Sequence, residues 1–104
     1  MKKILIIAAA MTLGAAAYAA DPAAGREKAK ACAACHGDNG VSQAPDFPKL
    51  AGQYNDYLVR ALNDYKSGAR KNAIMAGLVA NLKKEDIVDI AAYYSSQQAL
   101  ATKY

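Results

Sequence analysis

Apolar residues recur with the period of an amphipathic helix in two segments of this chain. In the first segment, from Tyr54 to Lys66, they fall at i, i+3, i+4, i+7, i+8 and i+11, and Gly68 ends the pattern. The second segment covers about residues 84–98, and its apolar face carries Ile87, Ile90, Ala91 and Tyr94. Both segments are therefore predicted to be helices with one buried face.

Two further helices are predicted from end signals and composition. Asp21 followed by Pro22 reads as an N-cap and a first helical residue, and the Ala-, Lys- and Glu-rich run to about residue 35 favours a helix. Gly25 interrupts that run at a cost, which indicates a close packing contact. A short helix is expected over 76–82. Because no strand-like alternation of useful length appears, the predicted fold class is all-α.

A long stretch from residue 37 to about 52 separates the first helix from the second. It contains Gly37, the Asp38-Asn39-Gly40 turn signal, Pro45 and Pro48. Irregular segments of this length are uncommon inside small domains unless something organises them. A buried prosthetic group would do so.

The first 19 residues have the pattern of a cleavable secretory signal. Two lysines precede an uncharged, apolar run, and Ala17-Tyr18-Ala19 offers small residues at the positions that a signal peptidase reads. We expect cleavage after Ala19, with cleavage after Ala20 as the alternative. The apolar run is shorter than the roughly 20 residues of a spanning helix, so no stable membrane anchor is expected. The predicted organisation is a signal peptide over 1–19 and one domain over 20–104.

The net charge and the length of the domain that remains after cleavage limit its possible binding partners and the size of its hydrophobic core. The 104-residue chain has a formal net charge of +4, but two of its positive charges leave with the signal. The mature domain is only mildly basic, and nothing in it indicates nucleic-acid binding. A domain this small, with one Phe and no Trp, has a marginal hydrophobic core and usually needs an additional stabilising element.

The chemistry is concentrated in Cys32-Ala33-Ala34-Cys35-His36. A C-x-x-C-H run is the signature of c-type haem attachment, in which two thiols form thioethers and the next histidine becomes the proximal iron ligand. Other interpretations are a structural disulfide, a thioredoxin-like redox pair and a zinc site. A redox pair favours a βαβ context, and a zinc site needs four ligands where the chain has three Cys and His side chains.

Met75 is the second candidate iron ligand. His36 is the only histidine, and Met75 is the only methionine beyond the predicted signal. A thioether is a good axial ligand for an electron-transfer haem. We place Met75 in an irregular segment, at the end of the basic loop 69–75. The alternative is that Met75 only fills the core.

These residues resemble class I cytochromes c, in particular short bacterial monohaem members and each half of dihaem ones. The similarity rests on the haem-binding run and on five softer segments in the expected order, ending with Asp86-Ile87 through Ala91-Ala92-Tyr93-Tyr94. The other segments are 47–53, Tyr57-Leu58, 65–70 and Met75. The resemblance implies four to five short helices around one covalently attached haem c.

The resemblance also implies roles for individual residues. The carbonyl of Pro48 would accept a hydrogen bond from Nδ1 of His36, Leu50 would pack on the haem, and Arg70 would pair with a haem propionate or be a solvated loop charge. Gly25 would let the last helix cross closely, against Ile90 and Tyr93 or Tyr94. Where the family often caps the last helix with Ser or Thr this chain has Lys83, so that helix start is expected to fray.

The expected function is periplasmic transfer of single electrons rather than enzymatic catalysis. Ligation of haem by His36 and Met75 would leave no position for substrate. The resemblance implies partners in a respiratory chain, such as a quinol-oxidising complex and a terminal oxidase or reductase, and a monomer or weak dimer. Six lysines could surround the haem edge: Lys28, Lys30, Lys49, Lys66, Lys71 and Lys84. Alternatives are a haem-based ligand binder or sensor with a labile sixth ligand and a bound electron-transfer subunit of a larger redox enzyme.

Overall fold

The computed structural model describes residues 19–98, so the predicted signal peptide lies almost wholly outside the described residues. Five helices make up the fold, and the described part of the chain contains no strand. Their bounds are α1 Pro22–Lys28, α2 Lys30–His36, α3 Asn55–Ser67, α4 Ala73–Val79 and α5 Lys84–Ser96. The all-α prediction is confirmed. None of the described helices is both long and apolar enough to cross a membrane.

The predicted first helix is wrong in one respect, because it consists of two helices. The chain leaves regular helical geometry at Ala29, where φ is −86° and ψ is 6°, and α2 begins at the next residue. The Ala29 carbonyl accepts hydrogen bonds from the N–H groups of both Cys32 and Ala33, at 2.9 and 3.0 Å. Ala29 is also part of the buried core. Composition favoured an uninterrupted helix here, and tertiary packing overrides it.

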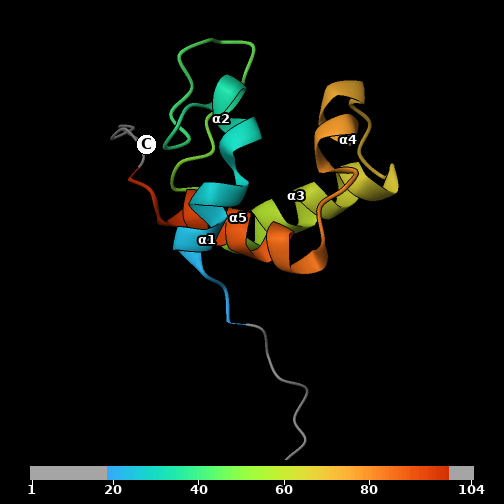
Figure 1. Cartoon of the computed structure of the whole chain (residues 1–104). Coiled ribbons are helices and arrows are strands. Elements are labelled where there is room, and N and C mark those ends of the chain that lie inside the picture. The colour runs from blue at the N-terminus through green and yellow to red at the C-terminus, as the bar shows by residue number, and fades with distance from the viewer. Residues whose placement is uncertain (1–18, 99–104) are drawn as a thin grey trace, which may run out of the picture.

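α1 and α5 cross closely and form the base of the fold (Figure 1). Gly25 makes this approach possible, since a Cβ there would lie 1.9 Å from the Asp89 carbonyl oxygen and 3.0 Å from Cβ of Tyr93. The expected close crossing is confirmed, but the nearest atoms belong to Asp89 and Tyr93 rather than to Ile90 or Tyr94. Lys28 closes the same contact with a 2.6 Å ion pair to the buried Asp89 carboxylate.

The hydrophobic core lies between the crossing helices and α3. It contains the predicted apolar face of α5 together with residues from the first and third helices: Ala29, Leu58, Ile90, Ala91, Tyr93 and Tyr94. α2 and α4 rise on the same side of the layer formed by α3 and α5 (Figure 1). The loop 37–54 closes the remaining side, and its Gly40 carbonyl accepts bonds from Leu50 and Ala51.

The start of α5 has a partner that the sequence interpretation missed. Lys83 offers no capping side chain, but its backbone N–H donates to Asp86 Oδ2 at 2.8 Å. This bond and a second one from Lys28 lower the pKa of the Asp86 carboxyl. One unpaired N–H group is thereby satisfied, which opposes the fraying that we expected at Lys83.

Candidate haem site

The two cysteines lie on α2, and His36 is the last residue of that helix. Cys32 and Cys35 are three positions apart and therefore neighbours on the helix surface, and both are half-buried free thiols. Burial raises the pKa of the Cys32 thiol. A redox-active cysteine has a lowered pKa, so this environment does not support the thioredoxin-like interpretation.

The His36 ring is buried and held by the loop. Its exposed fraction is 6%, and its Nδ1 lies 2.7 Å from the carbonyl oxygen of Pro48, as the resemblance implied. Since a carbonyl can only accept, Nδ1 carries the proton, and Nε2 keeps the lone pair that a metal needs. A hydrogen bond of this kind fixes the orientation of a ligating imidazole and raises its basicity.

All seven predicted site residues line one cavity of about 510 Å³. They are Cys32, Cys35, His36, Pro48, Leu50, Arg70 and Met75. The sequence interpretation missed several large side chains of the same wall, in particular Phe47, Tyr57, Ile74 and Leu78. These four are also among the exposed large hydrophobic residues of the described chain. Apolar residues that remain exposed at a cavity mouth are a signal only once the fold is known.

Met75 lies in the first turn of α4, so our placement of it in an irregular segment was wrong. The helix starts three residues earlier than predicted because the side chain of Asn72 caps it. Oδ1 of Asn72 accepts a 3.0 Å hydrogen bond from the Met75 N–H. Asn is among the preferred N-cap residues, and this signal was present in the sequence. The cap fixes the backbone of the residue whose side chain reaches the cavity.

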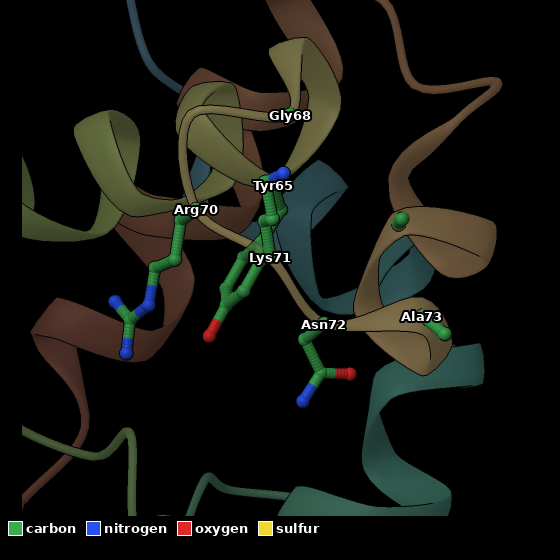
Figure 2. Close-up of a pocket in the computed structure, with 7 residues that line it drawn as sticks. Tyr65, Gly68, Arg70, Lys71, Asn72 and Ala73 are labelled. Atoms are coloured by element: carbon green, nitrogen blue, oxygen red, sulfur yellow. The ribbon is translucent and has the colours of Figure 1, made fainter.

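Arg70 is held at the rim of the cavity by two tyrosines. Its Nη1 donates to the Tyr57 hydroxyl at 3.1 Å, and its guanidinium carbon lies 4.8 Å from the centre of the Tyr65 ring. The bond to Tyr57 raises the pKa of the guanidinium, which stays positive. Figure 2 shows the side chains of Arg70, Tyr65 and Asn72 extending to the same side of the loop, beside a shallow neighbouring hollow. The guanidinium of Arg70, held in place at this rim, could form an ion pair with a carboxylate of a bound group.

Most of the six lysines that we considered for the haem edge do not line this cavity. Only Lys49 lines it, and Lys71 lines the neighbouring hollow. Lys28 instead pairs with Asp89 and, at 3.0 Å, with Asp86 at the crossing of α1 and α5. The positive charge near the cavity mouth therefore comes from the loops before α3 and α4.

The residues present fit a covalently held haem. The cavity combines two thiols on one helix, an imidazole with a free Nε2, and a thioether on another helix. It also lies within the size range of cofactor pockets, about 300–1,000 Å³, and its wall is mostly apolar. By contrast, residues 19–98 contain no group of three His, Cys, Asp or Glu side chains that could hold a metal ion by themselves.

Comparison with known proteins identifies one family. A family model described as "Cytochrome c" matches residues 13–98. Cytochrome c4 from Pseudomonas aeruginosa is 48% identical over 97 residues, covering 90% of this chain and 48% of that protein. Cytochrome c-554(548) from Halomonas halodenitrificans is 47% identical over 83 residues, covering 77% of this chain and all of that protein. The chain spans about half the length of the cytochrome c4 relatives that it matches.

The fold is similar as well. The crystal structure of reduced cytochrome c4 from Pseudomonas stutzeri superposes with a TM-score of 0.73 at 46% identity, covering 77% of this chain and 47% of that one. The arrangement of helices implied by the resemblance is therefore confirmed.

Proposed function

Because the chain belongs to the cytochrome c family and carries covalently attached haem c, we propose that it is a periplasmic electron-transfer protein with His/Met axial ligation. One observation supports this proposal most strongly. His36 and Met75 lie on different helices, yet both line the cavity that also contains the two cysteines. A cofactor attached to α2 in this cavity would therefore have both candidate ligands, His36 and Met75, in its walls.

The residues of α2 would hold and orient the cofactor. Cys32 and Cys35 would form the two thioethers, which fix the group to the helix that ends in His36. The hydrogen bond to the Pro48 carbonyl holds the His36 ring with Nε2 available as the proximal ligand. Leu50 would pack against the group from the loop side.

Met75 would be the sixth ligand. Ligation by both side chains leaves no coordination position for a substrate or gas, so we assign the chain no catalysis of its own. When bound, haem supplies an iron that changes reversibly between two oxidation states and so stores one electron. The apolar wall excludes water from it, and Arg70 at the rim would bind one of its carboxylates.

The test is a pair of substitutions at Met75 in holoprotein matured in an exporting host. Met75→Leu keeps the apolar volume but removes the sulfur, whereas Met75→Ala removes both. We expect both variants to retain haem by intact mass, to have a lower reduction potential, and to bind carbon monoxide rapidly when reduced. Native potential and no carbon monoxide binding in Met75→Leu would show that Met75 only fills space.

The same experiment separates the electron carrier from the ligand-binding alternative. A sensor with a labile sixth ligand would bind carbon monoxide rapidly in the unsubstituted protein at neutral pH.

Export is tested by the mass of the mature chain, which we expect to begin at Ala20 after removal of residues 1–19.

The redox partners belong to the same proposal. We infer a quinol-oxidising complex as donor and a terminal oxidase or reductase as acceptor, with the chain acting as a monomer or weak dimer. Size-exclusion chromatography of the native periplasm would test the alternative that the chain is a permanent subunit of a larger enzyme. Elution of all the cytochrome at the size of a large complex would contradict a diffusing carrier.

A further inference from the structure

Tyr94 of α5 carries a buried polar atom that the function described so far does not use. The residue is 1% exposed, and its side chain lines the cavity. Its hydroxyl has no hydrogen-bond partner among residues 19–98. Buried hydroxyl groups in folded proteins almost always have a partner, so an unpaired one in a cavity wall requires an explanation.

The neighbouring tyrosine shows that this fold can satisfy a phenol internally. The Tyr93 hydroxyl donates a 2.6 Å hydrogen bond to the Asp38 carbonyl, and the two rings pack with their centres 5.1 Å apart. At Tyr94 the backbone carbonyl accepts hydrogen bonds from the N–H groups of Gly52, at 3.0 Å, and Gln97, at 3.2 Å, but the hydroxyl has no partner among the described residues. Leu and Phe have apolar side chains that could fill this buried position without the cost of an unpaired hydroxyl.

One candidate partner that shares the cavity wall is on α2. Cys32 packs against the core cluster that contains Tyr94, and both residues line the cavity. Burial, and after it the Cys32 group, raise the pKa of the Tyr94 phenol, which therefore remains a neutral donor at physiological pH. A neutral phenol can donate only an uncharged hydrogen bond to a thiol or thioether sulfur.

Attachment of haem changes what the Cys32 sulfur can do. The thiol adds across a vinyl group, so that sulfur forms a bond to one vinyl carbon and its hydrogen passes to the other. A thiol is both a weak donor and a weak acceptor, whereas a thioether can only accept. Attachment would thus leave a sulfur that can only accept and a hydroxyl that lacks an acceptor in the wall of the same cavity.

We propose that Tyr94 is a positioning residue for the haem, whose hydroxyl donates a hydrogen bond to the Cys32 thioether sulfur. This inference depends on attachment at Cys32, as set out above. The bond would hold the attached edge of the haem against α5, so that the helix at the base of the fold contacts the cofactor directly. The positive end of the O–H dipole would also point to the haem edge and stabilise the reduced state.

The test compares two conservative substitutions in holoprotein. Tyr94→Phe removes only the hydroxyl and keeps the ring, and Tyr93→Phe is the matched control because its lost bond lies wholly within the protein. Intact mass first establishes that both variants carry haem through two thioethers. Attachment at Cys35 alone in Tyr94→Phe, with both thioethers in Tyr93→Phe, would itself support a role at Cys32.

The reduction potential then gives the answer. We expect a shift to lower potential in Tyr94→Phe and none beyond experimental error in Tyr93→Phe. We also expect an unfolding equilibrium constant that is roughly twofold to tenfold larger for Tyr94→Phe, the usual effect of one hydrogen bond. An unchanged or raised potential in Tyr94→Phe, or a gain in stability, would overturn the proposal.

A crystal structure of the holoprotein identifies the acceptor. The Cys32 sulfur within hydrogen-bonding distance of the Tyr94 hydroxyl would support the assignment. A buried water or a haem carboxylate in that place would overturn it, even if the potential shifts.

Discussion

Replacing Gly25 with alanine tests the close crossing of α1 and α5. An ideal Cβ at this position would lie 1.9 Å from the carbonyl oxygen of Asp89 and 2.5 Å from its carbon. These are backbone atoms inside α5, so they cannot rotate away as a flexible side chain would. Ordinary contact begins at about 3.4 Å, and α1 would have to move away from α5 by roughly 1.5 Å.

Two effects of opposite sign decide the magnitude. Alanine is favoured over glycine inside a helix by about 1 kcal/mol. Against this, overpacking in a tight core typically costs about 1–3 kcal/mol, and occasionally more. The movement would also lengthen the 2.6 Å ion pair between Lys28 and Asp89 and the 2.9 Å bond from the Asp21 N–H to the same carboxylate. Packing and helix propensity together then give a loss of about 0–2 kcal/mol, to which the two lengthened contacts with the Asp89 carboxylate add, so we expect Gly25→Ala to destabilise the holoprotein by about 1–3 kcal/mol.

The chain provides a matched control for this measurement. Gly77 is also helical, but no atom lies within 4 Å of a Cβ built there, so Gly77→Ala should gain about 0.5–1 kcal/mol. Urea unfolding of both variants, followed by far-ultraviolet circular dichroism, should give shifts of opposite sign. A Gly25→Ala protein as stable as Gly77→Ala would refute the reasoning, because the crossing would then have room for a methyl group.

Substitutions at three other positions probe the site and the helix ends. Asn72→Ala should lower the stability of the holoprotein by about 1 kcal/mol and weaken ligation by Met75. Asn72→Ser keeps a capping side chain and should preserve the near-infrared absorption of sulfur-ligated iron. An equal loss of stability and absorption in both variants would count against capping. Asp86→Asn should be less stable at neutral pH, and its stability should depend less on acid. The reason is that a carboxyl with a lowered pKa stabilises the fold above its unfolded pKa and loses this effect as the pH falls below about 4. Identical acid unfolding curves for the variant and the native protein would contradict this. Arg70→Gln should lower the reduction potential, since a nearby cation favours the less positive iron, and an unchanged potential would identify Arg70 as a solvated charge.

The sequence was most informative where local chemistry decides the structure. The helical periods of α3 and α5, the Gly68 end of α3 and the Asp21 cap of α1 are local signals, and the structure confirms these helices and ends. The predicted buried face of α3 is confirmed only in part, because Leu58 is buried whereas Tyr54 and Tyr57 are exposed. The Cys32–His36 attachment run is equally local, because the spacing of its two cysteines and its histidine alone identifies the haem-binding chemistry.

Features set by tertiary contact were harder to predict. The break at Ala29 has no breaker residue, and it depends on how α1 packs against α5 while α2 turns toward the cavity. Lys28 resembles any surface lysine in the sequence, yet it pairs with the buried Asp89. Asn72 is a preferred N-cap residue and could have been recognised in the sequence, but we assigned it to the basic loop 69–75. The unpaired hydroxyl of Tyr94 could be recognised only from the packed core.

The near-infrared absorption spectrum of the oxidised native holoprotein tests the central claim most directly. Ligation of the iron by the thioether of Met75 opposite His36 predicts a weak sulfur-to-iron charge-transfer band at neutral pH. We expect the band in the native protein and its complete loss in Met75→Leu, with the mass of doubly attached haem in both. A native protein with the correct mass but without the band would contradict a closed, electron-carrying site.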